Sequence, residues 1–204
     1  MADSGFTLGF HGCDQTVGEQ ILAGRTHIRW SENEYDWLGS GSYFWENNPL
    51  RALSWAYFVQ QNARLFPHTI KRPFVVGAII ETGRCLDLSV ESSLQDIERA
   101  YFEMRETFRV TGSAVPVNEE GFTGDMDLVK RHLDCAVINF LHSLRDERGL
   151  PTFDTVRGHF PEGGPLFDGA RIMARTHVQI CVRTPERSIR GYFRPIPNVG
   201  LEVP

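Results

Sequence analysis

The sequence predicts an α+β fold, with helices in the middle of the chain and β-rich segments at both ends. Patterns typical of strands occur near the N-terminus and again in the last third, and two long amphipathic patterns lie between them. Helices and strands that are segregated along the chain favour α+β over alternating βαβ units. The 204 residues, 41% of them hydrophobic, are enough for one buried core. We therefore expect a single domain over residues 1–204.

The chain is expected to begin with a strand, a turn and a short helix. Residues 6–11 alternate weakly between polar and apolar side chains and end at Gly12, which predicts a short strand. The helix is predicted over residues 17–23. Asp14 or Thr16 is its expected N-cap, because a short polar side chain at that position accepts a hydrogen bond from the first turn.

A stronger helix is predicted to begin at residues 48–49. Asn48 is a favourable N-cap, and Pro49 suits the first helical position, where its missing N–H costs nothing. Leu50, Leu53 and Tyr57 recur at helical spacing and are expected to form the buried stripe.

The middle of the chain is predicted to be mainly helical. Residues 93–108 and residues 126–144 each place apolar side chains on one side of a helix. The segment between them, 110–125, contains Gly, Ser, Pro and Asn and is predicted to be a loop. Together these elements form a helical insertion over residues 91–146.

Strands are predicted on both sides of this insertion. Residues 74–80 are a run of mostly β-favouring residues, typical of a central strand. Three further strands are expected at 153–157, 178–182 and 189–193. The glycine- and proline-containing segment 161–165 predicts a loop after the first of these three.

Composition limits the function and the location of the protein. The formal net charge of −5 argues against a protein that coats nucleic acid. No apolar run is long enough to span a membrane and no secretion signal is recognisable, so we expect a cytoplasmic protein without a membrane partner. The four cysteines form no CxxC pair and the histidines are scattered, so we expect reduced thiols and no metal site.

The most informative motif is the glycine-rich and aromatic segment 37–46. Gly39 and Gly41 allow a tight turn and a close approach of the backbone to a ligand. Tyr43 and Phe44 follow at once and offer flat faces for stacking on a ring. This combination favours a nucleotide-like ligand.

Three segments together resemble the signature of ADP-ribosyltransferases of the diphtheria-toxin and poly(ADP-ribose) polymerase type. These are His11-Gly12, residues 39–44 and residues 176–182, and the resemblance covers most of the chain at low density. It implies split antiparallel β-sheets with flanking helices and a central helical insertion. It also implies a cleft that holds nicotinamide adenine dinucleotide (NAD) as a co-substrate.

The resemblance also implies roles for individual residues. His11 corresponds to the histidine that hydrogen-bonds a ribose hydroxyl, and the Gly12 backbone to the group that holds the nicotinamide amide. Tyr43 corresponds to the residue that stacks on the nicotinamide, and Trp55 would form the opposite wall of the slot. The implied catalytic residues are His11, Tyr43 and Gln179, and the cofactor-binding residues are His11, Gly12, Gly41, Tyr43, Trp55 and Arg51.

Gln179 stands where these enzymes have their catalytic glutamate. A glutamine forms hydrogen bonds but does not take up a proton at neutral pH, so transfer of one ADP-ribose is favoured over chain elongation. If a carboxylate must accept the proton of the acceptor, the sequence offers Glu46, Glu162 and Asp154. Arg51 is one of several arginines that would suit the NAD pyrophosphate.

The sequence therefore predicts a mono-ADP-ribosyltransferase that modifies an intracellular macromolecule, either a protein or a nucleic acid. Compact enzymes of this kind resemble toxins of bacterial toxin-antitoxin or anti-phage defence systems, so an antitoxin protein is an expected partner. Two alternatives stay open at this point. One is a catalytically inactive module that binds NAD or ADP-ribose, which Gln179 favours, and the other is an NAD glycohydrolase, in which water is the acceptor.

Overall fold

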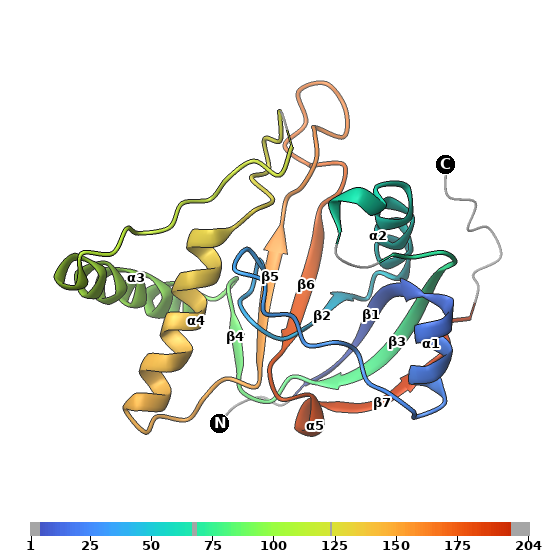
Figure 1. The fold of residues 1–204 in the computed structure, drawn as a ribbon, viewed down its shortest axis with the longest axis horizontal. Coiled ribbons are helices and arrows are strands. Elements are labelled where there is room, and N and C mark those ends of the chain that lie inside the picture. Colours follow the sequence, from blue (N-terminus) through green and yellow to red (C-terminus); the bar gives the residue numbers. More distant parts are fainter. Residues whose placement is uncertain (1–4, 67–68, 123, 197–204) are drawn as a thin grey trace.

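The computed structural model describes residues 5–66, 69–122 and 124–196, and it is a mixed α+β structure built on one sheet (Figure 1). The sheet has seven strands in the order β4-β5-β6-β2-β1-β3-β7. The strands are β1 (Phe6–Asp14), β2 (Ser42–Glu46), β3 (Pro73–Glu81), β4 (Cys85–Asp87), β5 (Thr155–Phe160), β6 (His177–Val182) and β7 (Ile189–Phe193). The helices are α1 (Gln15–Leu22), α2 (Pro49–Gln61), α3 (Glu91–Thr111), α4 (His132–Glu147) and α5 (Pro185–Ser188), with a 3-10 turn at Ala63–Leu65.

The sheet consists of two halves joined by a narrow ladder. Neighbouring strands are antiparallel except β4 and β5, which are parallel. β1 pairs with β3 along its whole length, from Phe6 opposite Glu81 to Asp14 opposite Pro73. β1 pairs with β2 only where Gly9 faces Glu46 and Phe10 faces Trp45. The two halves therefore separate just beyond Phe10, next to His11.

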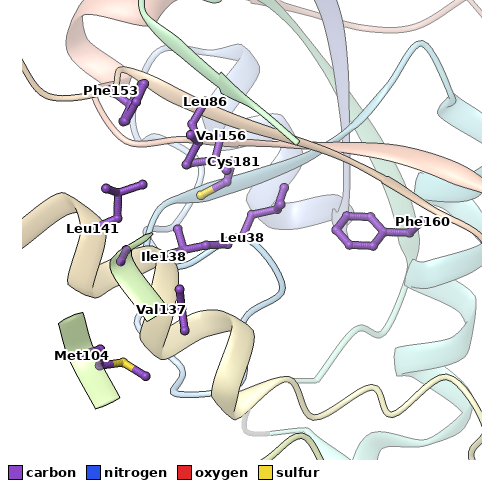
Figure 2. Packing of buried hydrophobic residues seen from close by; sticks show 11 residues of the cluster. Leu38, Leu86, Met104, Val137, Ile138, Leu141, Phe153, Val156, Phe160 and Cys181 are labelled. Carbon is purple, nitrogen blue, oxygen red and sulfur yellow. The ribbon is translucent and has the colours of Figure 1, made fainter. Parts of the chain in front are cut away.

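Helix α4 lies along the end of the sheet formed by β4 and β5, and α3 packs against α4 (Figure 1). Leu38 is fully buried there among Ile138 of α4, Val156 of β5 and Cys181 of β6 (Figure 2). A second core lies on the other face of the sheet, where Ile21 of α1 packs with side chains of β2, β3 and β6. Apolar side chains are thus buried on both faces, so the central strands are held from two sides.

The buried face of α2 is not the predicted one. Ala52, Ala56 and Val59 are completely buried, whereas Leu50 and Tyr57 are 46% and 37% exposed. Small side chains on the inner face allow the helix backbone to lie directly on the sheet, and large side chains would hold it away. The predicted start of α2 is confirmed, because the Asn48 side chain accepts a hydrogen bond from the Arg51 amide.

Helix α4 begins later than the sequence predicts, at His132 instead of residue 126. The buried Asp125 carboxylate accepts hydrogen bonds from the amides of Gly121, Asp127 and Val129. These bonds hold the backbone in a turn, and the Met126 side chain is 95% exposed. Side chains that bond to nearby backbone amides compete with helix formation in this way.

Two strands were not predicted. β2 lies in the aromatic segment that follows the glycines, and β4 is only Cys85–Asp87.

The cysteines are unpaired as predicted, with Cys13, Cys135 and Cys181 buried and Cys85 half-buried. No helix within the described ranges combines the length and the apolar character needed to cross a membrane.

Candidate functional site

His11 lies at the point where β1 and β2 separate. Its Nδ1 atom is 2.8 Å from the Tyr43 carbonyl oxygen, which is the acceptor, so Nδ1 donates. If the β1–β2 ladder continued in register, the main chain of Gly12 would face Tyr43. The imidazole therefore replaces a main-chain hydrogen bond and bridges the opening between the two halves of the sheet. Its ring also meets the Phe44 ring edge-on, at 6.1 Å between centroids.

The Tyr43 phenol is held by the glycine-rich loop. Its hydroxyl accepts a hydrogen bond of 2.8 Å from the Leu38 amide and donates one of 2.6 Å to the Gly39 carbonyl. Burial raises the pKa of the phenol well above its usual value, so the hydroxyl keeps its proton. In this structure Tyr43 fixes the conformation of the loop that precedes β2.

Replacing Tyr43 by phenylalanine is expected to lower the free energy of unfolding by about 1–3 kcal/mol. The ring would stay in place, but the buried Leu38 amide would lose its partner and the Gly39 carbonyl would keep only the Cys181 thiol as a donor. Urea denaturation followed by tryptophan fluorescence measures the change. An unchanged stability would show that the hydroxyl does not hold the loop.

A cluster of polar side chains lies beside this region, and we call it the Glu162 cluster. It comprises Arg51, Glu162, Arg175, His177 and Gln179. Arg51 donates a hydrogen bond of 2.6 Å to Glu162, whose side chain is only 10% exposed. The other Glu162 oxygen is 3.7 Å from Arg175, and His177 Nδ1 is 3.5 Å from Glu162. Gln179 joins the cluster through a contact of 2.9 Å between its Nε2 and His177 Nε2.

The Glu162 cluster adjoins two tryptophans. The Arg51 guanidinium lies 5.9 Å from the centre of the Trp45 ring, and Trp45 is 6.0 Å from Trp55. Trp45 faces Gln179 across the β2–β6 ladder. The structure thus brings Arg51, Trp55 and Gln179 together around Trp45, on the face of the sheet that α2 covers.

His11 and Tyr43 lie on the edge of this region and on different faces of the sheet. Side chains alternate along a strand, so Tyr43 and Trp45 share one face while Phe44 points to the other. His11 packs against Phe44, and Tyr43 packs into the core below α4. The imidazole is linked to Tyr43 through the main-chain carbonyl, not through the phenol.

Gly12 and Gly41 are places where chain segments touch. A Cβ atom on Gly12 would lie 2.1 Å from the Ala52 carbonyl oxygen, so α2 rests directly on β1 at this point. A Cβ atom on Gly41 would lie 2.4 Å from Cys181 Sγ. Both glycines permit contacts that any larger residue would prevent.

Of the three carboxylates that the sequence offers, only Glu162 belongs to this cluster. Glu46 binds Arg157 at 2.7 Å and Thr7 at 2.9 Å. Asp154, which precedes β5, accepts hydrogen bonds from the Arg84 amide and the Thr184 hydroxyl. Both of these carboxylates are thus occupied by partners outside the cluster.

His177 belongs to the cluster, although its sequence context predicted no role for it. Residues two apart on a strand share a face, so the strand pattern at 177–182 could have placed His177 beside Gln179. No sequence signal joins Glu162 to Arg51, because the two residues meet only when the loop after β5 returns to the start of α2.

One open hollow of about 470 Å³ lies beside α1 and contains none of the predicted site residues. It is lined by Gln15, Thr16, Glu19, Gln20, Ala23, Arg25 and Arg72. In the part of the chain that the structure describes, no three His, Cys, Asp or Glu side chains are grouped as metal ligands.

Comparison with known proteins shows a similarity to an uncharacterized archaeal protein. No family model matches the chain, and no solved structure matches it. An uncharacterized protein of Methanocaldococcus jannaschii, MJ0359, is 26% identical over 196 aligned residues, which cover 86% of this chain and 81% of the archaeal protein. The similarity extends over most of both chains, and the name of the archaeal protein assigns no activity.

Proposed function

We propose that the protein is a mono-ADP-ribosyltransferase with an ADP-ribosyltransferase-like fold that uses NAD as co-substrate. The acceptor is an intracellular macromolecule, a protein or a nucleic acid, and the enzyme acts as the toxin of a toxin-antitoxin or anti-phage system. The observation that carries the proposal is the group formed by Arg51, Trp55 and Gln179 around Trp45, at the end of the β1–β2 ladder. His11 bridges the two strands beside this group, from the other face of the sheet.

The proposed reaction requires positioning more than acid-base chemistry. The bond between ribose C1′ and the nicotinamide nitrogen breaks, nicotinamide leaves with the electron pair, and the acceptor nucleophile forms a bond to C1′. Positive charge develops on the ribose, so aromatic walls and polar anchors can stabilise the transition state. Glu162 is the proposed proton acceptor, because it is the carboxylate of the cluster and lies 3.5 Å from Nδ1 of His177, whose other ring nitrogen contacts Gln179.

An inactive module that binds NAD or ADP-ribose is the second candidate. Two observations favour it. Gln179 cannot take up a proton at neutral pH. The Tyr43 hydroxyl already accepts a hydrogen bond from the Leu38 amide and donates one to the Gly39 carbonyl. In such a module the ligand would signal through a bound partner, and NAD would stay intact.

Incubation of the protein with NAD labelled on the adenylate, in a cell extract, tests the proposal. We expect a labelled macromolecule and free nicotinamide, and loss of both in the His11→Ala and Gln179→Ala variants. His27→Ala is the matched control, since His27 contacts Tyr192 away from the Glu162 cluster. Treatment of the labelled product with nuclease or protease then identifies the class of acceptor.

Other outcomes separate the alternatives. Free ADP-ribose without a labelled macromolecule would indicate the glycohydrolase. Tight NAD binding in calorimetry with no release of nicotinamide would indicate the inactive module. If the protein neither binds nor cleaves NAD, the proposal is wrong.

A further inference from the structure

The hydrogen bonds of His177 determine which of its ring nitrogens carries the proton. Nδ1 is 2.8 Å from the Arg175 carbonyl oxygen, which can only accept, so Nδ1 carries the hydrogen. Burial, followed by the positive charge of Arg51, lowers the pKa of His177 below its usual value, although the Arg175 hydrogen bond acts in the opposite direction. A neutral imidazole with hydrogen on Nδ1 leaves a lone pair on Nε2.

This tautomer fixes the orientation of the Gln179 amide. The lone pair of His177 Nε2 requires a donor, and Gln179 Nε2 lies 2.9 Å away. The amide nitrogen therefore faces His177, and the amide oxygen Oε1 points away from it. Within the described residues, Oε1 makes no hydrogen bond, and the Gln179 side chain is half-buried.

We infer that His177 is a positioning residue that turns the Gln179 amide oxygen outward as an acceptor for a ligand hydroxyl group. The inference rests on the proposed function, in which that hydroxyl belongs to a ribose of NAD. Only the oxygen of a glutamine resembles a carboxylate as an acceptor, whereas the amide nitrogen would meet a hydroxyl as a donor. With its oxygen outward, Gln179 supplies the hydrogen-bonding half of what a glutamate would do.

Protonation of His177 reverses this arrangement. An imidazolium donates from both nitrogens, so the amide would have to turn its oxygen toward His177 and its nitrogen toward the ligand. The groups that act on this proton lie on three elements. They are Arg51 of α2, Glu162 and Arg175 of the loop between β5 and β6, and His159 of β5. The Trp37 and Phe160 rings cover the imidazole and keep it from solvent.

Three variants test the positioning role through NAD binding, measured by calorimetry. His177→Phe keeps the contacts with Trp37 and Phe160 but frees the amide to rotate, and we expect about 5- to 10-fold weaker binding. Adding Gln179→Glu to this variant should restore binding, because both oxygens of a carboxylate are acceptors in either orientation. If His177 acted only in packing, adding Gln179→Glu would not restore NAD binding. Near-ultraviolet circular dichroism verifies that each variant is folded.

The tautomer gives a readout that does not depend on NAD. Long-range nitrogen NMR spectra of the histidine side chains should show His177 protonated on Nδ1 alone at neutral pH, and Gln179→Leu should shift the Nε2 resonance. Hydrogen on Nε2 in the wild-type protein would overturn the inference whether or not NAD binds. Absence of NAD binding together with the expected tautomer would instead overturn the proposed function and the ligand assigned to Oε1.

Discussion

Replacing Arg51 by methionine is expected to lower the free energy of unfolding by about 3–5 kcal/mol. Arg51 and Glu162 form a hydrogen-bonded pair at 2.6 Å, and their side chains are only 14% and 10% exposed. Methionine leaves the Glu162 carboxylate buried. The nearest arginine is then Arg175, whose guanidinium lies 3.7 Å from the carboxylate. A buried charge that loses its hydrogen-bonded partner costs much more than the net contribution of the pair itself. Urea denaturation of the two proteins at neutral pH measures the loss.

Arg175→Met is the matched control for this prediction. Its side chain is 53% exposed and reaches the same carboxylate from 3.7 Å, so its removal should cost no more than about 1 kcal/mol. The double variant Arg51→Met with Glu162→Leu should be more stable than Arg51→Met alone, because no unpaired charge is then left. Equal losses in the two arginine variants would contradict the idea that Arg51 and Glu162 are a buried pair.

The elements that the sequence predicted are those whose signals are local. The Asn48 cap, the strand at 74–80 and the strand at 189–193 depend on neighbouring residues only, and all three are present. The inner face of α2 could not be read in this way. Hydrophobicity favours Leu50 and Tyr57, but the absence of a side chain at Gly12 lets the α2 backbone lie against β1, where alanines fit best.

The candidate site was predictable only one residue at a time. His11 and Gln179 were recognised from short motifs, and Glu162 and Arg51 were considered separately as a carboxylate and as an anion ligand. Their pairing depends on the return of the loop after β5 to the start of α2. Tyr43 was expected to stack on a ligand ring, which stays a prediction, and the structure adds that its hydroxyl holds the loop before β2. A motif therefore identifies residue types, and the hydrogen bonds of the fold decide which atoms remain available to a ligand.

Acidification from pH 7 to pH 5 is expected to lower the free energy of unfolding by about 2 kcal/mol through His142 alone. His142 of α4 is 4% exposed, and neither ring nitrogen has a hydrogen-bond partner in the described part of the chain. Burial, with smaller effects of Arg183 and Arg145, lowers its pKa from 6.5 to about 3. Between these two values the unfolded chain binds a proton that the folded protein does not, so stability falls as pH falls.

His142→Phe isolates this contribution, because phenylalanine fills a similar volume beside Phe153 and does not titrate. Urea denaturation gives the free energy of unfolding at pH 7 and at pH 5. The decrease between the two pH values should be about 2 kcal/mol smaller for the variant than for the wild-type protein. The range stops at pH 5 because carboxylates with lowered pKa, such as Asp14 at about 2, begin to contribute only in more acidic solution. Groups such as His177 titrate in both proteins and cancel in the comparison. An equal decrease in the free energy of unfolding for the wild-type protein and the variant would contradict the prediction. It would mean that the His142 ring has a hydrogen-bond partner or a water molecule inside the fold.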